Sequence, residues 1–269
     1  MQIIESLRAS IIGLGLRVLA MFRPDLFGVT VVVTSCARHD LLNNTLTSFF
    51  KYNSFPIKHM IIVEDGNQVA NALVSKFRSE PIEWLATGRR VGQIAAIDYA
   101  YSRVKTPYIF HLEDDWEFYR PGFIERSMQI LRVQPTCLQV WLRALGDTNE
   151  HPCERHVFTK HGISWQRLIL DFQQGKWHGF SFNPGLRRLT EYVATGGFGN
   201  LTSFDFYDPW KTEIAIGRFY RRKGYFAAIL CDQEGQGYVR HTGDNHHTAP
   251  PPEFSDKHHS SSENISTPA

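Results

Sequence analysis

Residues 28–118 alternate between two kinds of hydrophobic pattern. Short apolar runs rich in β-branched residues, such as Val29–Thr34, are followed by longer stretches whose apolar residues recur every three or four positions. The short runs predict strands buried on both faces, and the longer stretches predict amphipathic helices. We expect strands at 29–34, 59–63, 82–85 and 108–112, with helices at about 41–50, 69–79 and 91–104. Strands separated by helices predict an α/β fold with a Rossmann-like, mostly parallel sheet flanked by helices.

The first 27 residues precede this alternation and have a pattern of their own. Apolar residues at positions 4, 7, 11, 14, 18 and 22 have helical spacing. The apolar run Ile11–Phe22 is interrupted by Arg17, and it is shorter than the ~20 residues of a membrane-spanning helix. No convincing signal-peptide cleavage site follows it. This helix either packs on the domain or lies on a membrane surface, where Arg8, Arg17 and Arg23 would meet anionic lipid.

The last 26 residues, 244–269, are rich in Pro, Ser and His and have no periodicity, which predicts a disordered tail. The chain therefore divides into an N-terminal helix (1–27), one domain (28–243) and the tail. The four cysteines are far apart and form no CxxC motif, which predicts reduced thiols rather than a disulfide scaffold or a zinc finger. Reduced thiols without a signal peptide predict a cytoplasmic protein, peripheral at a membrane face if the N-terminal helix binds one.

The charge of the chain is nearly balanced, with 29 Lys and Arg against 27 Asp and Glu. A net charge of +2 excludes a strongly basic nucleic-acid-binding segment as the main function. Candidate chemistry must therefore come from local clusters of polar residues.

Three such clusters follow predicted strands, at Ser35–Asp40, Glu64–Gly66 and Glu113–Glu117. Ligands of open α/β sheets bind outside the carboxyl ends of the strands, so we expect these clusters to share one edge. The carboxylates of Glu113–Asp115 would repel one another unless a cation neutralised them. Mg²⁺ or Mn²⁺, bound by one or two carboxylates and substrate phosphates, fits this position. The alternative is an acidic surface turn.

Two further features support an anionic ligand. Asp65 could accept hydrogen bonds from a ribose, or it could cap the next helix. Arg89 and Arg90 precede the helix that begins near Gln93, and guanidinium groups at a helix N-terminus favour anion binding. The chain has no GxGxxG and no GxxxxGK[ST] motif, so Rossmann dinucleotide binding and P-loop chemistry are not supported.

Two segments of the chain, taken in the order in which they occur, resemble the sequences of a known family. The first, VTVVVTSCARHDLLNNTLTSFFKYNSFPIKHMIIVEDG, and the second, RRVGQIAAIDYAYSRVKTPYIFHLEDDWEF, resemble the opening blocks of glycosyltransferase family 2. The second block contains a DxD-type motif at Glu113–Asp115. The resemblance spans Val29 to about Phe118 and implies a GT-A fold, with a nucleotide-binding half (28–118) and an acceptor-side half (119–243).

The resemblance also implies roles for individual residues. Asp115 would be the main ligand of the metal, and His241, in the segment Gly237–Gly243, would complete the metal site or touch the diphosphate. Arg38 would lie near the base, Asp65 would hold the uracil or ribose, and Asp114 would contact the ribose or donor sugar. The nucleotide- and donor-binding set is Thr34, Ser35, Arg38, Asp65, Arg90, Gln93 and Asp114.

Glu213 matches the catalytic carboxylate that this family places at the start of a helix ahead of a Gly-Tyr step, here Gly224-Tyr225. An acidic residue also suits a helix N-terminus for structural reasons, and Asp205 and Asp208 are alternative bases. The segment Ser181–Arg188 predicts a strand that runs into an Arg-bearing loop, which faces the substrates or forms a structural turn. The chain departs from the family where an Asn-x-Gly…Ala-Arg-Asn block is usual, because it has Arg90-Val91-Gly92 and Ala96-Ile97-Asp98.

We therefore expect a metal-dependent, inverting glycosyltransferase that uses Mn²⁺ or Mg²⁺. It would move a sugar from a nucleoside-diphosphate sugar, with UDP favoured, to a hydroxyl of a glycan, lipid-linked or protein acceptor. The alternatives are a nucleotidyltransferase-type enzyme and a non-catalytic carbohydrate-binding or scaffold protein with the same fold.

Overall fold

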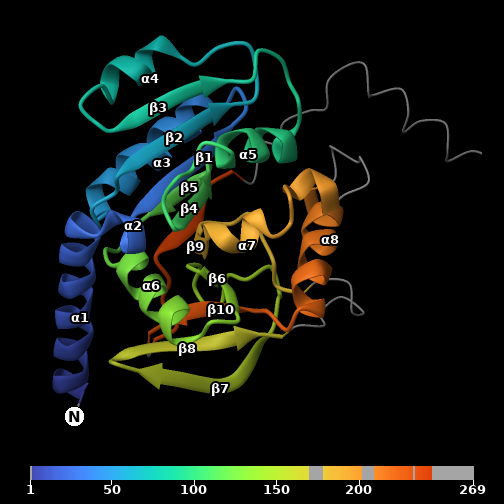
Figure 1. Cartoon of the computed structure of the whole chain (residues 1–269). Helices are drawn as coiled ribbons and strands as arrows, with labels where there is room; N and C mark the ends of the chain where they lie inside the picture. Colours follow the sequence, from blue (N-terminus) through green and yellow to red (C-terminus); the bar gives the residue numbers. More distant parts are fainter. Residues whose placement is uncertain (1, 170–177, 202–208, 233, 244–269) are drawn as a thin grey trace, which may run out of the picture.

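Figure 1 shows a computed structural model that describes residues 2–169, 178–201, 209–232 and 234–243. The predicted tail, 244–269, lies outside the described residues. A nine-stranded sheet of order β3-β2-β1-β4-β9-β6-β10-β8-β7 forms the centre, and β11 pairs with β5 in a separate small sheet. The strands are β1 (Val29–Ser35), β2 (His59–Glu64), β3 (Ile82–Ala86), β4 (Tyr108–Glu113), β5 (Trp116–Phe118), β6 (Cys137–Trp141), β7 (Cys153–Lys160), β8 (Ile163–Leu168), β9 (Gly185–Arg188), β10 (Phe226–Cys231) and β11 (Val239–His241). The helices are α1 (Gln2–Phe22), α2 (Pro24–Phe27), α3 (His39–Tyr52), α4 (Asn71–Lys76), α5 (Gln93–Tyr101), α6 (Phe123–Val133), α7 (Leu189–Val193) and α8 (Pro209–Arg222), with a 3-10 turn at Phe198–Leu201.

The half of the sheet formed by β3, β2, β1 and β4 is parallel, as predicted. In its register Ser35 pairs with Glu64 of β2, and Thr34 pairs with Glu113 of β4. The carboxyl ends of these three strands therefore meet at one edge, which is where the sequence places its polar clusters. All seven residues of β1 are buried, which explains why its sequence is a continuous β-branched run.

Alternate residues of these strands enter two separate hydrophobic layers. Val31 and Val33 of β1 pack with side chains of α1, α3, α4 and α6. Val32 packs on the other face with side chains of α5, α7 and α8. Figure 1 shows α1 and α6 on one side of the sheet, with α5, α7 and α8 on the other. The sheet is thus covered on both faces, as an α/β fold requires.

The second half of the sheet mixes strand directions. β9 lies antiparallel between β4 and β6, β10 is parallel to β6, and β8 and β7 follow antiparallel to their neighbours. The predicted arginine-bearing loop after 181–186 is wrong, because Arg187 and Arg188 belong to β9 itself. Arg187 is buried against Phe180, and Arg188 forms an ion pair with Glu191. This favours the structural alternative for the segment.

Helix α1 confirms the predicted helix but packs through a different face. The predicted apolar stripe at positions 4, 7, 11, 14, 18 and 22 is exposed, with exposed fractions from 45% at Val18 to 77% at Phe22. The buried positions are Ala9, Leu16 and Ala20, together with Gly13. Small residues on this side let α1 approach α6 closely, which is why the bulkier stripe faces outward. Within the described residues, no helix is both long and apolar enough to cross a bilayer.

Candidate active site

The ends of β1, β2 and β4 hold a cluster of buried carboxylates. Glu64, Asp65, Asp114 and Asp115 are all buried, with Asp114 fully inaccessible. The alternative of an acidic surface turn at Glu113–Asp115 is therefore wrong. Thr34 and Ser35 at the end of β1 are also buried, and Ser35 lies beside the Asp114 carboxyl.

Arg38, at the start of α3, neutralises the acidic pair directly. Its Nη1 lies 2.8 Å from Asp115 Oδ2, its Nε donates to Asp114 Oδ2 at 3.2 Å, and its Nη2 donates to Asp114 Oδ1. Two charge-assisted hydrogen bonds to one carboxylate fix both groups in a planar fork. The structure thus places the Arg38 guanidinium directly on the carboxylates of Asp114 and Asp115.

His241, which lies near the C-terminal end of the domain in sequence, contacts the carboxylate of Asp115. β11 pairs with β5 so that His241 lies opposite Trp116, and its Nε2 is 3.3 Å from Asp115 Oδ2. The backbone N–H and hydroxyl of Thr242 both donate to the Asp115 carbonyl, at 2.8 and 2.9 Å. The structure therefore brings the side chains of Asp115 and His241 together.

The residues around Asp115 fit a divalent ion with few protein ligands. Asp115 Oδ1 is buried and has no hydrogen-bond partner among the described residues. The part of the chain that the structure describes contains no cluster of three His, Cys, Asp or Glu side chains arranged around one metal position. Because Mg²⁺ often takes only one or two protein ligands and the rest from phosphates and water, Asp115 with His241 would be enough to hold a divalent ion of this kind.

Burial and charge set different pKa values along the acidic cluster. Burial raises the pKa of Asp114 to about 6, although the Arg38 charge opposes this. Burial also raises the pKa of Glu113, and the neighbouring charge of Asp115 adds to the effect. Burial acts in the same direction on Asp115, but the hydrogen bond from His241 and the charge of Arg38 outweigh it and lower the pKa of that carboxyl. Asp115 is thus the group held most firmly as an anion.

Asp65 holds the loop before α5. Its Oδ1 accepts a hydrogen bond from the Val91 N–H at 2.7 Å, and its Oδ2 accepts one from the Gly92 N–H at 2.9 Å. The Thr87 hydroxyl donates to Oδ1 at 3.2 Å. Asp65 therefore positions the loop that contains Arg90, and Arg90 lies beside the Cys36 thiol at the end of β1.

Two carboxylates of the predicted polar clusters, for which the sequence indicated no individual role, also shape the site. Glu64 Oε1 accepts a hydrogen bond from the Ala37 N–H at 2.6 Å, which stabilises a turn where Ala37 has φ of 56°. Glu113 Oε1 accepts from the Gln93 side chain at 2.6 Å. Their position opposite Ser35 and Thr34 in the strand register is the signal that could have identified them.

Glu213 lies in the first half of α8 and faces the site. The Ser181 hydroxyl and the Phe182 N–H both donate to its Oε1, at 2.9 and 2.8 Å. Burial raises the pKa of Glu213 to about 7, against these hydrogen bonds and the charge of Arg187. The charge of Glu213 in turn raises the pKa of Glu113, so the two carboxyls are electrostatic neighbours. The alternative bases, Asp205 and Asp208, lie outside the described residues.

The departure from the usual family block has a structural explanation at Asp98. Its Oδ1 accepts hydrogen bonds from the Tyr192 hydroxyl and the Phe198 N–H, both at 2.9 Å. Its Oδ2 accepts from the Gly199 N–H at 2.8 Å. Asp98 therefore ties α5 to the turn after α7 rather than facing the strand ends.

Solved structures with a similar backbone are glycosyltransferases. A Staphylococcus aureus TarS fragment, residues 1–349, has a TM-score of 0.54 and 12% identity over 80% of this chain and 60% of that one. The mannosyltransferase PcManGT from Pyrobaculum calidifontis, in complex with GDP-Man and Mn²⁺, has a TM-score of 0.53 and 12% identity over 86% and 68%. A longer TarS structure has a TM-score of 0.53 and 13% identity over 80% and 36%. The chain thus spans about 60% of the TarS fragment.

These likenesses confirm the predicted GT-A fold. A comparison with the sequences of characterised proteins gives no significant match. The sequence model of glycosyl transferase family 2 matches residues 30–188, which is more than half of the chain and includes β1, β2, β4 and the acidic cluster. The chain therefore belongs to glycosyltransferase family 2.

Proposed function

We propose that the chain is a metal-dependent, inverting glycosyltransferase. It transfers a sugar from a nucleoside-diphosphate sugar, with UDP favoured, to a hydroxyl group of a glycan, lipid-linked or protein acceptor. One observation carries the proposal: the carboxylates of Asp114 and Asp115, ion-paired with Arg38, lie at the same sheet edge as a carboxyl, Glu213, whose pKa is raised to about 7. The similar structure of PcManGT, described with GDP-Man and Mn²⁺, supports a nucleotide-sugar donor and a divalent ion.

The donor nucleotide binds across the ends of β1, β2 and β4. Thr34 and Ser35 line its pocket, and Asp114 contacts the ribose or the donor sugar. Asp65 contributes by holding the loop of Arg90 in place, because the loop N–H groups occupy both of its oxygens. The donor- and nucleotide-binding set remains Thr34, Ser35, Arg38, Asp65, Arg90, Gln93 and Asp114.

Asp115 and His241 would hold the Mn²⁺ or Mg²⁺ ion, which when bound supplies Lewis-acid stabilisation of the departing diphosphate. Arg38 adds a fixed positive charge beside that carboxylate. Preorganised positive charge of this kind stabilises developing negative charge without reorganisation during the reaction.

Glu213 accepts the proton of the acceptor hydroxyl as that oxygen attacks the anomeric carbon. The hydrogen bonds from Ser181 and Phe182 hold its Oε1, so the carboxylate keeps one orientation. A general base is most effective when its pKa lies near the working pH, and the pKa of about 7 meets this condition.

The test is a thermal-shift series with UDP, GDP, CDP and dTDP, each with Mn²⁺ or with EDTA, followed by product analysis with the matching nucleotide-sugar. A ligand at 100 times its Kd should stabilise the fold by about 2.7 kcal/mol. We expect a shift that requires Mn²⁺ with one diphosphate, and release of that diphosphate during sugar transfer. Release of pyrophosphate from a nucleoside triphosphate would instead indicate a nucleotidyltransferase, and nucleotide binding without turnover a binding protein.

We also propose that the protein contacts a membrane surface through residues 1–23. The exposed stripe on α1 supports this, since Ile4, Ile11 and Phe22 are 57%, 67% and 77% exposed. Helices that lie in a bilayer interface present such an apolar face to the lipid. A membrane contact would suit a lipid-linked acceptor.

A further inference from the structure

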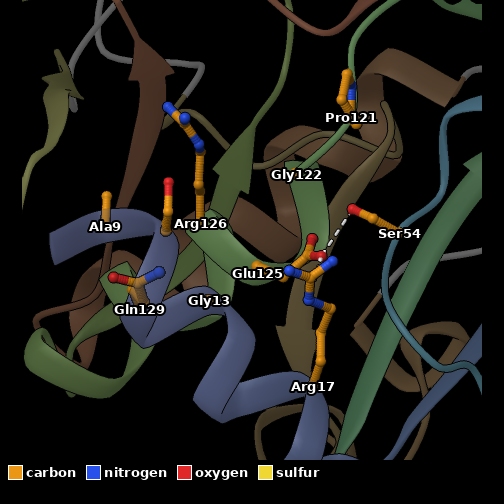
Figure 2. Close-up of a pocket in the computed structure, with 10 residues that line it drawn as sticks. Ala9, Gly13, Arg17, Ser54, Pro121, Gly122, Glu125, Arg126 and Gln129 are labelled. Atoms are coloured by element: carbon orange, nitrogen blue, oxygen red, sulfur yellow. Dashed lines mark hydrogen bonds and ion pairs between the residues drawn. The ribbon is translucent and has the colours of Figure 1, made fainter. Parts of the chain in front are cut away.

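A cavity of about 280 Å³ lies between α1 and α6, away from the strand ends. Figure 2 shows its lining, with Gln129 beside Gly13 of α1 and Glu125 between Arg17 and Ser54. The residues that line it are Ala9, Ser10, Gly13, Arg17, Ser54, Pro121, Gly122, Glu125, Arg126 and Gln129. The volume is far larger than the roughly 30 Å³ of one water molecule, so the cavity can hold a small polar group.

Gln129 is the clearest sign that the cavity is built for a ligand. Its side chain lines the cavity and the residue is only 6% exposed, yet neither Nε2 nor Oε1 has a hydrogen-bond partner among the described residues. Buried amides are nearly always hydrogen-bonded, because an unpaired one is costly. A ligand in the cavity would supply the missing partners.

The charges around the cavity favour an anion. Arg17 and Arg126 line it with a single carboxylate, Glu125, so the lining has one excess positive charge. Glu125 is partly neutralised, since it accepts a hydrogen bond from Ser54 at 2.7 Å and lies 3.8 Å from Arg17 Nε. Helix α6 begins at Phe123, after Gly122, and within the described residues no side chain caps its N-terminus. The N-terminus of a helix favours an anion. A phosphate group suits this set of donors.

Gly13 lies on the side of α1 that borders this cavity. A Cβ added at Gly13 would lie 3.7 Å from Glu125 Cβ and 3.9 Å from Gln129 Nε2, so a longer side chain there would enter the cavity. Leu14, the next residue, belongs to the exposed apolar stripe and is 55% exposed. The polar cavity and the apolar stripe therefore belong to the same helix, and Gly13 and Leu14 are about 100° apart around its axis.

We propose that the cavity binds the phosphate group of an anionic phospholipid while the apolar stripe of α1 lies on the bilayer. Arg17, Arg126 and the α6 N-terminus bind the phosphate oxygens, and the Gln129 amide donates to one of them. The proposal rests on the membrane contact of residues 1–23 and adds to it a specific lipid site. Helix α1 therefore selects the phospholipid headgroup and also attaches the protein to the bilayer.

The test is co-sedimentation of the full chain with phosphatidylcholine vesicles, with and without phosphatidylglycerol. We expect the wild-type protein to bind the anionic vesicles about fivefold more tightly, or better, as one favourable charge near the surface implies. Gly13→Leu should abolish this preference, because its side chain fills the cavity without changing the charge. Gly15→Leu is the matched control on the same helix, since a Cβ at Gly15 has no atom within 4 Å, and it should keep the preference.

Gln129→Leu provides a second variant that does not depend on filling the cavity. It removes an unpaired buried amide, so it should raise the melting temperature while it reduces the preference for phosphatidylglycerol. A melting temperature that rises while the preference stays at the wild-type value would overturn the proposal. So would equal preference in Gly13→Leu and Gly15→Leu.

The remaining outcomes separate this proposal from the membrane contact on which it rests. Ile11→Glu should abolish binding to both kinds of vesicle. If the wild-type protein binds both vesicles equally, the membrane contact stands and the lipid site is wrong. If it binds neither, both proposals fail, while the thermal-shift series still decides the transferase activity. If inorganic phosphate binds the lipid-free protein, and Gly13→Leu blocks it without any effect on vesicle binding, the ligand is free phosphate and the lipid assignment is wrong.

Discussion

The carboxyl groups of Asp115, at the acidic strand end, and of Glu213, at the start of α8, have different environments, which shift their pKa values in opposite directions. At the strand end, Arg38 and His241 lie on Asp115 and lower its pKa. At α8, the hydrogen-bond donors to Glu213 within the described residues are one hydroxyl and one N–H, and burial raises the pKa of Glu213 to about 7. Environments that move the pKa values of neighbouring carboxyls apart give them different roles. Asp115 is therefore suited to hold cations, and Glu213 is suited to exchange a proton.

Removal of the proton acceptor should have the largest effect on activity. In Glu213→Gln, which preserves the shape of the side chain, we expect kcat to fall by about 1,000-fold, within the usual range for loss of a general base. The Kd for the nucleotide should not change, because Glu213 does not hold the donor. Steady-state kinetics and nucleotide titration measure the two quantities. Wild-type turnover in this variant would remove Glu213 from the mechanism.

Removal of charge at the strand end should affect binding as well as turnover. For Asp115→Asn we expect kcat/KM to fall by about 100-fold, as when one electrostatic contact to the transition state is lost, together with loss of the Mn²⁺-dependent thermal shift. Glu117→Gln is the control: Glu117 lies two residues further on, in an exposed ion pair with Arg240, and such pairs contribute little. Equal kinetics in the two variants would contradict a special role for Asp115.

The pH profile distinguishes the two carboxyls without a large loss of activity. Because the pKa of Glu213 is raised to about 7, the carboxyl is protonated and unable to accept a proton below that pH. We therefore expect kcat/KM to decrease about tenfold per pH unit below about 7. The residual activity of Glu213→Gln should lack this dependence. An acidic limb that persists in the variant would assign it to another group, with Glu113 the nearest candidate in the site.

The nucleotide-binding half could be predicted from the sequence because its signals are local. The runs that form β1, β2 and β4 are apolar on both faces and end in polar residues, so the strands and the edge they share follow from the pattern alone. The proximity of Asp115 and His241 came instead from the family resemblance, since 126 residues separate them in the sequence.

What could not be predicted depends on packing between distant elements. The apolar stripe of α1 indicates a helix, but it does not say which face a partner covers, and the small residues Ala9 and Gly13 proved to be the buried ones. Similarly, the residues next to Arg38 in the sequence do not indicate that its guanidinium binds Asp114, since the two residues are 76 positions apart. In the sequence, nothing distinguishes Gln129 from the other polar residues of a helix, and the burial of its side chain is visible only in the structure.

The position of β9 has a consequence for the order of folding during synthesis. This strand, the last element of the segment that matches the family model, lies between β4 and β6. The two halves of the sheet therefore cannot join until residue 188 has left the ribosome. Until then β4 has an unpaired edge, which is a site where nascent chains aggregate. We expect truncations that end before Gly185 to be insoluble, and the ribosome-bound chain to become protease-resistant only after β9 emerges.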